Sequence, residues 1–222
     1  MAILLTILWK VILPVFIIIA LGYLLERRLS LDVRSLSRVT FYALTPCLVF
    51  SSMTRSSISG TDIWKIVSFV LLTTLTMGLF SWAVTRALRF GRAMESAFLL
   101  ATLFVNAGNY GLPVNLFAFG QAGLERAAIF FTVSALLNHS VGVYLASRGQ
   151  ASGLDALYNV FKVPVVYGVL ASFVVNLVAI TVPEPVAKAV NLLGGASVPL
   201  MLLLVGIQLA RISLASELKV IG

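Results

Sequence analysis

Two amide side chains stand in the middle of an otherwise apolar stretch, Ala93 to Phe119, within the segment Asn-Ala-Gly-Asn-Tyr-Gly-Leu-Pro at residues 106–113. An amide can donate a hydrogen bond to a carboxylate without the cost of burying a fixed positive charge in a membrane. Asn106 and Asn109 are three residues apart, so they share a face on a helix and can both point into a cavity at a helix break. The residue types therefore predict a binding site for an anionic solute.

The same segment is poorly suited to a continuous helix. Gly108 and Gly111 each cost roughly 1 kcal/mol relative to alanine, and Pro113 costs roughly 3 kcal/mol. In lipid, a broken helix survives only inside protein or beside a water-filled cavity. We expect these three residues to shape a break and Tyr110 to stack on a planar solute. Three alternatives stay open: the asparagines cap freed backbone groups, the glycines form an ordinary packing face, and Tyr110 packs in the core.

Composition places the chain among polytopic membrane proteins. Of its 222 residues 60% are hydrophobic and only 11% are charged, with a mean hydropathy of +1.05, whereas soluble domains carry about 25% charge. The net charge of +8 comes from basic residues at the ends of apolar runs, so we reject nucleic-acid binding. Cys47 is the one cysteine, which excludes a disulfide within the chain and a Cys/His metal cluster. No catalytic groups converge, and we expect neither an enzyme nor a cofactor.

Apolar runs long enough to cross a bilayer predict seven membrane spans. Counting Lys and Arg in the connections gives 11 on one side and 5 on the other, and the positive-inside rule then predicts a cytoplasmic C-terminus and an external N-terminus in the cell (inner) membrane. The expected spans are 5–25, 37–54, 64–88, 93–119, 124–147, 158–181 and 187–211.

Prolines recur with a nearly constant offset. Pro14 and Pro164 are 150 residues apart, and Pro46 and Pro199 are 153 apart. A unit of five spans inserts its second copy upside down, as in many secondary transporters. We therefore expect a first five-helix repeat at residues 1–150 and an incomplete second repeat at 151–222. A second broken segment would fall near 256–266, beyond the last residue given. Either the sequence is a fragment or truncated product, or the interpretation as a repeat is wrong.

Further polar residues are expected within the spans. Asn138 and His139 lie in the fifth span and either couple solute movement to protons or pack as neutral hydrogen-bonded groups. The remaining candidates either flank a central cavity or form tolerated kinks and interhelical bonds: Pro46, Ser197, Pro199 and Gln208. The acidic residues, including Glu125, are expected in solvated loops.

In these segments the chain resembles the auxin efflux carrier family, specifically its bacterial permease branch. The resemblance rests on the stretch from Leu13 to Tyr23, on Leu44–Phe50, on Asn106–Pro113 and on the stretch from Gly194 to Leu209. It implies ten helices in two inverted repeats, similar to bile-acid symporters, with proline-broken fourth and ninth helices crossing at the centre. It also implies organic anion substrates such as auxin, malate or malonate. The family's Asn and Gly-x-Pro pattern maps onto Asn106, Gly111 and Pro113.

The function expected from these observations is secondary transport of a small organic anion by alternating access. Spans 3, 4 and 5 would rock against spans 1, 2, 6 and 7 within the lipid bilayer. Coupling to protons or sodium and assembly as a homodimer are compatible with this interpretation. The alternative is a non-transporting membrane module, or a subunit that needs a partner chain to complete the site.

Overall fold

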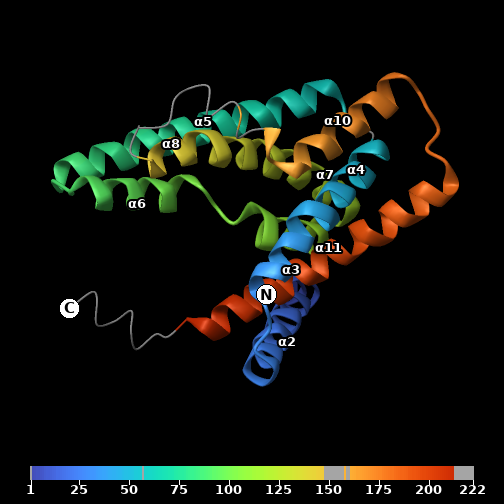
Figure 1. Cartoon of the computed structure of the whole chain (residues 1–222), viewed down its shortest axis with the longest axis horizontal. Helices are drawn as coiled ribbons and strands as arrows, with labels where there is room; N and C mark the ends of the chain where they lie inside the picture. The colour runs from blue at the N-terminus through green and yellow to red at the C-terminus, as the bar shows by residue number, and fades with distance from the viewer. Residues whose placement is uncertain (1, 57, 148–157, 159–160, 213–222) are drawn as a thin grey trace.

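The computed structural model describes residues 2–56, 58–147, 158 and 161–212, and this part of the chain is helical without any strand. Figure 1 shows the helices in chain order. The expected repeat boundary at 150/151, Arg148, Lys219 and the tail 213–222 lie outside the described residues. The elements are α1 (Ala2–Ile7), η1 (Leu8–Ile12), α2 (Leu13–Leu29), α3 (Val33–Val39), η2 (Thr40–Leu44), α4 (Thr45–Thr54), α5 (Gly60–Ala87), α6 (Arg92–Leu103), η3 (Ala107–Gly111), α7 (Leu112–Leu137), η4 (Asn138–Gly142), α8 (Val143–Ala146), α10 (Pro164–Leu177) and α11 (Glu184–Arg211).

Three prolines follow π-helical turns by the same spacing. The turns η1, η2 and η3 end two residues before Pro14, Pro46 and Pro113 respectively. Proline lacks a backbone donor, and its ring crowds the carbonyl four residues earlier. The wider π turn, which bonds five residues back, accommodates this crowding while the helix continues. The sequence shows where the prolines lie, but it does not reveal that a π turn precedes each of the three.

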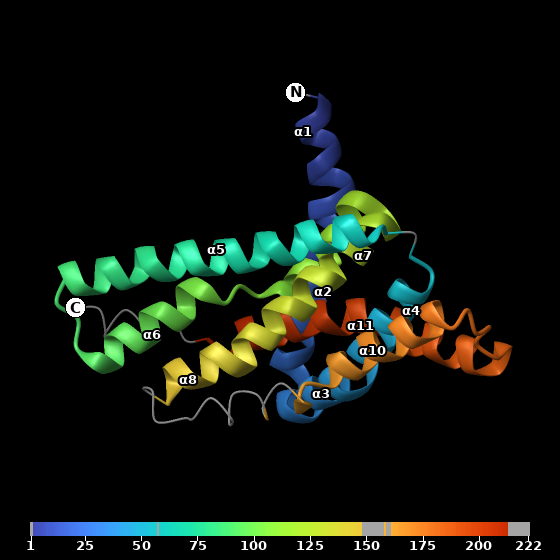
Figure 2. The ribbon, with the colours of Figure 1, turned by 90° about the horizontal axis from the view of Figure 1, so that it is seen from above.

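The helices form two groups that diverge in Figures 1 and 2. Helix α7 is divided at Gly120, where its backbone angles are not helical. The α5 group contains α5, α6, the second half of α7 and α8. Within this group α5 contacts α6 and α7, and α6 contacts α8. The α11 group contains α2, α3, α4, α10 and α11. The first half of α7 joins the two groups, because Leu112 packs in the core with Leu48 and Met201, while Val114 and Phe117 pack against α2 and α11.

Glycines allow very close backbone contact within the α11 group. A Cβ atom on Gly206 of α11 would lie 1.9 Å from the carbonyl oxygen of Ile19 on α2, and one on Gly22 would lie 2.3 Å from the carbonyl oxygen of Leu203. A Cβ on Gly168 of α10 would lie 2.6 Å from the carbonyl oxygen of Pro46 on α4. Small residues at such positions are the usual means of packing helices in membranes.

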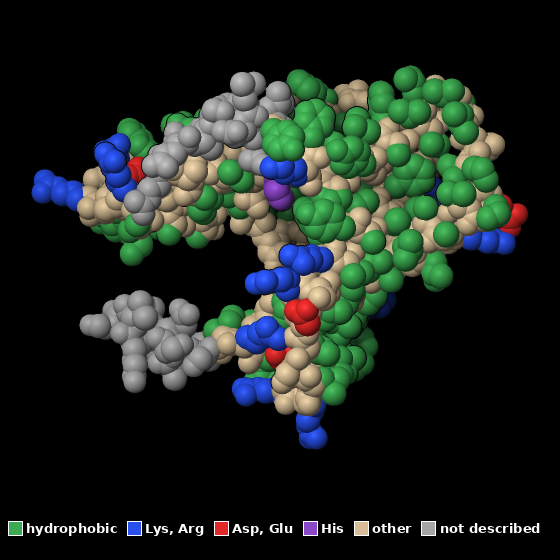
Figure 3. Space-filling model, in the orientation of Figure 1, with side chains coloured by type: hydrophobic (Ala, Val, Ile, Leu, Met, Phe, Trp, Pro, Cys, Tyr) green, Lys and Arg blue, Asp and Glu red, His purple; other side chains and the backbone are tan. Residues whose placement is uncertain are grey.

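Four helical segments of the described chain are long and apolar enough to cross a membrane: Leu5–Leu29, Gly60–Ala87, Arg92–Ala146 and Glu184–Arg211. Seven spans were expected. Arg92–Ala146 contains two of them, the fourth and fifth, and Pro164–Leu177 is a shorter apolar helix. Figure 3 shows hydrophobic side chains over much of the outer surface of the helices, as expected for an all-α polytopic membrane protein.

The connection between the fourth and fifth spans is shorter than expected. It consists of a kink at Gly120, whose φ of 65° and ψ of −154° are accessible essentially only to glycine. The expectation that Glu125 is a solvated loop charge is wrong. Because the kink folds the chain back at once, Glu125 is only 9% exposed, and it accepts a 2.8 Å hydrogen bond from the Ser56 hydroxyl.

Substituting Gly206 with alanine is expected to destabilise the protein. The added methyl group would force α2 and α11 apart, and overpacking of this kind costs about 1–3 kcal/mol. The matched control is Gly195→Ala on the same helix, where an added Cβ meets no atom within 4 Å. Thermal unfolding of the detergent-purified protein should show a lower midpoint for Gly206→Ala and an unchanged or higher one for the control. A Gly206→Ala midpoint at the wild-type value would contradict the close contact.

Candidate functional site: a helix break between two cavities

The predicted break in the fourth span is present, but it lies before both glycines in the sequence. Helix α6 ends at Leu103, Phe104 is extended with φ −111° and ψ 96°, and Asn106 has φ −74° and ψ 67°. A short turn closes the segment, in which the Ala107 N–H donates to the Val105 carbonyl oxygen at 2.8 Å. The helix then restarts at Ala107. The break therefore consists of Phe104–Asn106.

Gly108, Gly111 and Pro113 consequently lie inside the second half-helix. Gly111 donates its N–H to the Asn106 carbonyl oxygen at 3.1 Å, and Pro113 is buried in the first turn of α7. A Cβ on Gly108 would lie 2.9 Å from the ring of Phe131. Gly108 thus serves close packing, which was the alternative interpretation of the glycines.

Asn106 caps the restarting half-helix. Its side-chain oxygen accepts a 3.1 Å hydrogen bond from the Asn109 backbone N–H, so the capping role left open for it is confirmed. Its side-chain NH₂ group has no hydrogen-bond partner in the described part of the chain and remains a donor beside the adjoining cavities.

A central cavity of about 480 Å³ collects four of the predicted polar residues, Asn106, Asn109, Asn138 and His139. The side chain of Asn138 is exposed and that of His139 is half-buried. Its other lining residues come from η2 and its flanks, the break, α7 and α11: Ser37, Thr40, Phe41, Thr45, Phe104, Val105, Ala107, Gly108, Phe131, Ser134, Ala135, Met201 and Leu204.

His139 is held in place on both sides. Its Nδ1 lies 2.9 Å from the carbonyl oxygen of Ala135, and its ring stacks on Phe41 with centroids 5.8 Å apart. Because a carbonyl only accepts, Nδ1 carries the proton and Nε2 is left as an acceptor in the neutral ring. The residue belongs to η4, a π turn without a proline, and such turns are frequent at functional sites.

A lateral cavity of about 500 Å³ lies on the other side of the break. Val105, Asn106 and Ala107 border both cavities, so the end of the break and the first residue of the restarted helix lie between them. Tyr110 and Gly111 face the lateral cavity and not the central one. This cavity also contains Asn115 and Arg126.

Asn115 was missed in the sequence. Its side-chain NH₂ donates to the Gly111 carbonyl oxygen at 2.9 Å. It is an amide in an apolar half-helix, four residues after Gly111, and its spacing from the other amides could have identified it.

Four predicted cavity residues line neither the central nor the lateral cavity. Pro46 packs its backbone against Gly168, and the buried Ser197 hydroxyl lies 3.9 Å from the sulfur of Met201. Pro199 and Gln208 are exposed on α11. Periodicity could place these residues on helices but not on the face that borders the break.

Apart from His139, none of the described lining residues of the central cavity is acidic or basic. No group of three or more His, Cys, Asp or Glu side chains that could hold a metal ion occurs among the described residues. Basic side chains stand outside it. Figure 3 shows them around the hollow in which the histidine is visible, and α3, which contributes Ser37 to the cavity, carries Arg34 and Arg38.

A polytopic helical protein with a broken helix between two cavities belongs to the class of membrane transporters, and sequence comparison agrees. The chain matches the family described as "Membrane transport protein" over residues 7–156 and 151–221, and it belongs to this family. The resemblance to auxin efflux carriers is thereby confirmed.

Two curated relatives are archaeal proteins named uncharacterized transporters. One, from Methanothermobacter thermautotrophicus, is 28% identical over 207 residues, which cover 90% of this chain and 67% of the relative. The other, from Methanocaldococcus jannaschii, is 24% identical over 210 residues, covering 90% of this chain and 68% of the relative. No solved structure matches the chain significantly.

Two substitutions of Asn106 should separate its capping role from its donor role. Asn106→Ala removes the cap and should cost about 1 kcal/mol of stability. Asn106→Asp keeps an acceptor for the Asn109 N–H and adds negative charge at a helix N-terminus, where the dipole favours it. Thermal unfolding should therefore show a lower midpoint for alanine only. Equal losses in both variants would contradict the capping geometry.

Proposed function

We propose that this transporter carries a small organic anion, a carboxylate, and binds it in the central cavity. The observation that carries the proposal is the position of the break: Asn106 projects from the unwound segment into a cavity that also contains Asn109, Asn138 and His139. Side-chain NH₂ groups of the three asparagines supply neutral donors. A volume of about 480 Å³ is within the usual range for small-molecule sites.

Electrostatics support an anion over a cation. The half-helix that restarts at Ala107 begins at the cavity, because Asn106, Ala107 and Gly108 line it, and the dipole at a helix N-terminus favours negative charge. The central cavity has no carboxylate among its described lining residues to compensate a cation. Arg34 and Arg38 lie on α3, the helix that also carries the lining residue Ser37, and they would raise the local concentration of anions.

Alternating access is the mechanism that this arrangement supports best. The central and lateral cavities share the lining residues Val105–Ala107, at the end of the break. Movement of the α5 group relative to the α11 group would open one cavity and close the other, with Asn106 accessible from each in turn. Joints for this movement are the break itself and the kink at Gly120.

The inverted repeat remains part of the proposal and has new support from packing. Span 1 contacts span 7 through α2 and α11, and span 2 contacts span 6 through α4 and α10. A two-fold axis that exchanges spans 1 and 6, and spans 2 and 7, converts one contact into the other. Buried positions also recur at the proline offsets: Val15 with Val165 and Gly22 with Ser172 at 150, and Leu48 with Met201 and Val49 with Leu202 at 153.

A module that needs a partner chain is the second candidate. The chain spans about two thirds of the length of its curated relatives. In this candidate, another polypeptide completes the site. This candidate predicts equilibrium binding of the anion without flux by the chain alone. The carrier predicts both.

The decisive measurement is flux of radiolabelled malonate from proteoliposomes that contain the purified chain. Asn106→Asp should reduce flux at least about 10-fold, because it loses a donor to a charged ligand, worth about 1.5–3 kcal/mol, and adds repulsion. Asn138→Ala should reduce flux several-fold. Gln208→Ala, which alters an exposed amide outside the cavity, is the matched control and should retain full flux. Wild-type flux in Asn106→Asp would refute the proposed site.

A further inference from the structure

A second polar region surrounds Arg55, at the far end of α4 from the central cavity. Two adjoining cavities, of about 590 and 350 Å³, share the lining residues Ser51, Arg55 and Asn191. We call them together the Arg55 cavities. The central cavity is lined by residues between Ser37 and Thr45, at the other end of the continuous helical stretch formed by α3, η2 and α4. Since a helix rises about 1.5 Å per residue, Thr40 and Arg55 are separated by about 20 Å along the axis.

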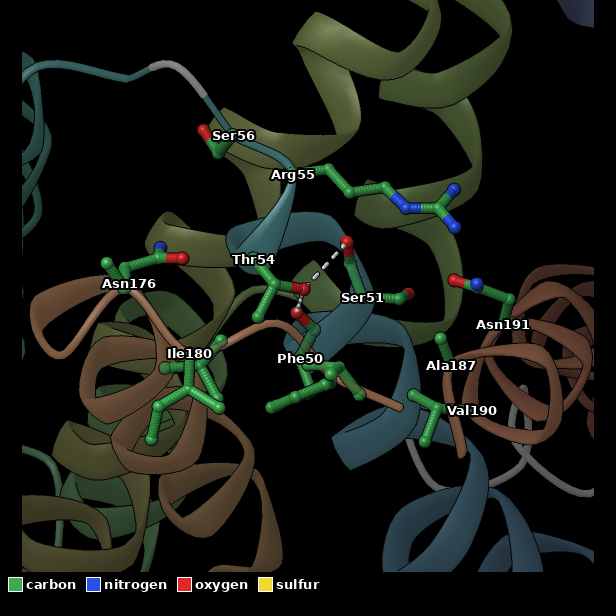
Figure 4. A pocket seen from close by; sticks show the side chains of 13 residues that line it. Phe50, Ser51, Thr54, Arg55, Ser56, Asn176, Ile180, Ala187, Val190 and Asn191 are labelled. Atoms are coloured by element: carbon green, nitrogen blue, oxygen red, sulfur yellow. Dashed lines mark hydrogen bonds between the residues drawn. The ribbon is translucent and has the colours of Figure 1, made fainter. Parts of the chain in front are cut away.

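Arg55 is an uncompensated cation in the described part of the chain. The ion pairs found there are Lys65–Asp62, Lys188–Glu184 and Arg211–Glu26, and Arg55 takes part in none of them. Figure 4 shows its guanidinium extending from the end of α4 across Ser51 toward Asn191 on α11. It thus stands over the gap between the two helices.

Ser52 supplies an independent observation. Its side-chain oxygen is the one buried side-chain polar atom without a hydrogen-bond partner among the described residues, and the residue is only 1% exposed. It lines the smaller of the Arg55 cavities. An unsatisfied buried hydroxyl costs about 1–3 kcal/mol. Many Ser and Thr hydroxyls among the described residues avoid that cost by donating to a carbonyl about one turn earlier, as Thr54 does to Phe50. A ligand in the cavity would satisfy the Ser52 hydroxyl.

The surroundings define the chemistry of that ligand. Arg55 offers a forked cationic donor that suits a carboxylate or phosphate group, and Ser52 and Asn191 offer neutral donors. Leu48, Leu124 and Val198 give the smaller cavity apolar walls. We propose that the Arg55 cavities form an anion-binding site, distinct from the central cavity, in which Arg55 and Ser52 bind an oxyanion. With the C-terminus in the cytoplasm, this site lies at the external end of spans 2, 6 and 7.

The oxyanion could be the carboxylate of a solute or the phosphate of an anionic lipid, because the two present the same acceptor chemistry. The cavities lie at the end of the spans, where lipid head groups are found. The site does not depend on the proposed transport function.

The test uses the Asn106→Asp chain, in which the central cavity repels anions, in nanodiscs of phosphatidylcholine. Titration calorimetry with malonate should detect remaining binding. Adding Arg55→Gln should weaken it at least about 10-fold and adding Ser52→Ala about 10-fold, since each removes a hydrogen bond to a charged ligand. The matched control, Lys188→Gln, removes a cation at the same end of α11 that is paired with Glu184, and it should leave binding unchanged.

Stability separates a ligand role of Ser52 from a structural one. Without ligand, Ser52→Ala should have an unfolding midpoint equal to or above that of its parent, because it removes an unsatisfied group. A lower midpoint without ligand would indicate a structural hydroxyl and overturn its assignment to the site.

A second arm replaces malonate with phosphatidylglycerol added to the nanodiscs. Arg55- and Ser52-dependent binding of this lipid, but not of malonate, identifies a head-group phosphate as the oxyanion. If Arg55→Gln changes the binding of neither probe, the proposed site is refuted. That result is distinct from failure of the central site, which would appear as unaltered malonate binding in Asn106→Asp alone.

Discussion

The arrangement of this protein depends on how the backbone is satisfied where the fourth span is interrupted. Unpaired backbone groups at membrane depth cost several kcal/mol each, so an interruption needs local partners. Here the Asn106 side chain caps the Asn109 N–H, the Asn106 carbonyl accepts from Gly111, and Asn115 donates to the Gly111 carbonyl. These three hydrogen bonds are local, all within ten residues. The chain can therefore unwind without hydrogen bonds from neighbouring helices, and this leaves space for two cavities.

Around that segment the molecule combines rigid and adjustable contacts. Glycine-mediated backbone contacts join α2 to α11 and α4 to α10, and close-packed interfaces of this kind resist sliding. The α5 group has no comparable connection to α11, and the first half of α7 joins the two. The two groups therefore differ in how closely their helices pack against one another.

Much of this architecture could be predicted from the sequence, because the surrounding membrane dictates the composition and the length of the apolar segments. The helical membrane fold and the interruption near Asn106 follow from residue types, and the family follows from the resemblance of four segments. The interruption lies earlier in the sequence than predicted, because π turns accommodate Pro14, Pro46 and Pro113 within helices. Helix-propensity scales do not represent such turns. Tertiary placement was less predictable. Asn138 and His139 face the cavity, whereas Pro199 and Gln208 do not, and Glu125 is buried because the chain reverses at a single glycine.

The thinness of the wall between the cavities has an electrical consequence. Both cavities are lined by the same three residues, Val105–Ala107, which reach at most about 10 Å along the chain, against about 30 Å for the hydrocarbon core. Where water fills the cavities on either side, the membrane voltage falls mainly across this short barrier and not evenly over the bilayer. A charged solute would then perform most of its electrical work, about 2.3 kcal/mol per charge at 100 mV, in passing one side chain. Transport of a net charge would be strongly voltage-dependent at that single step.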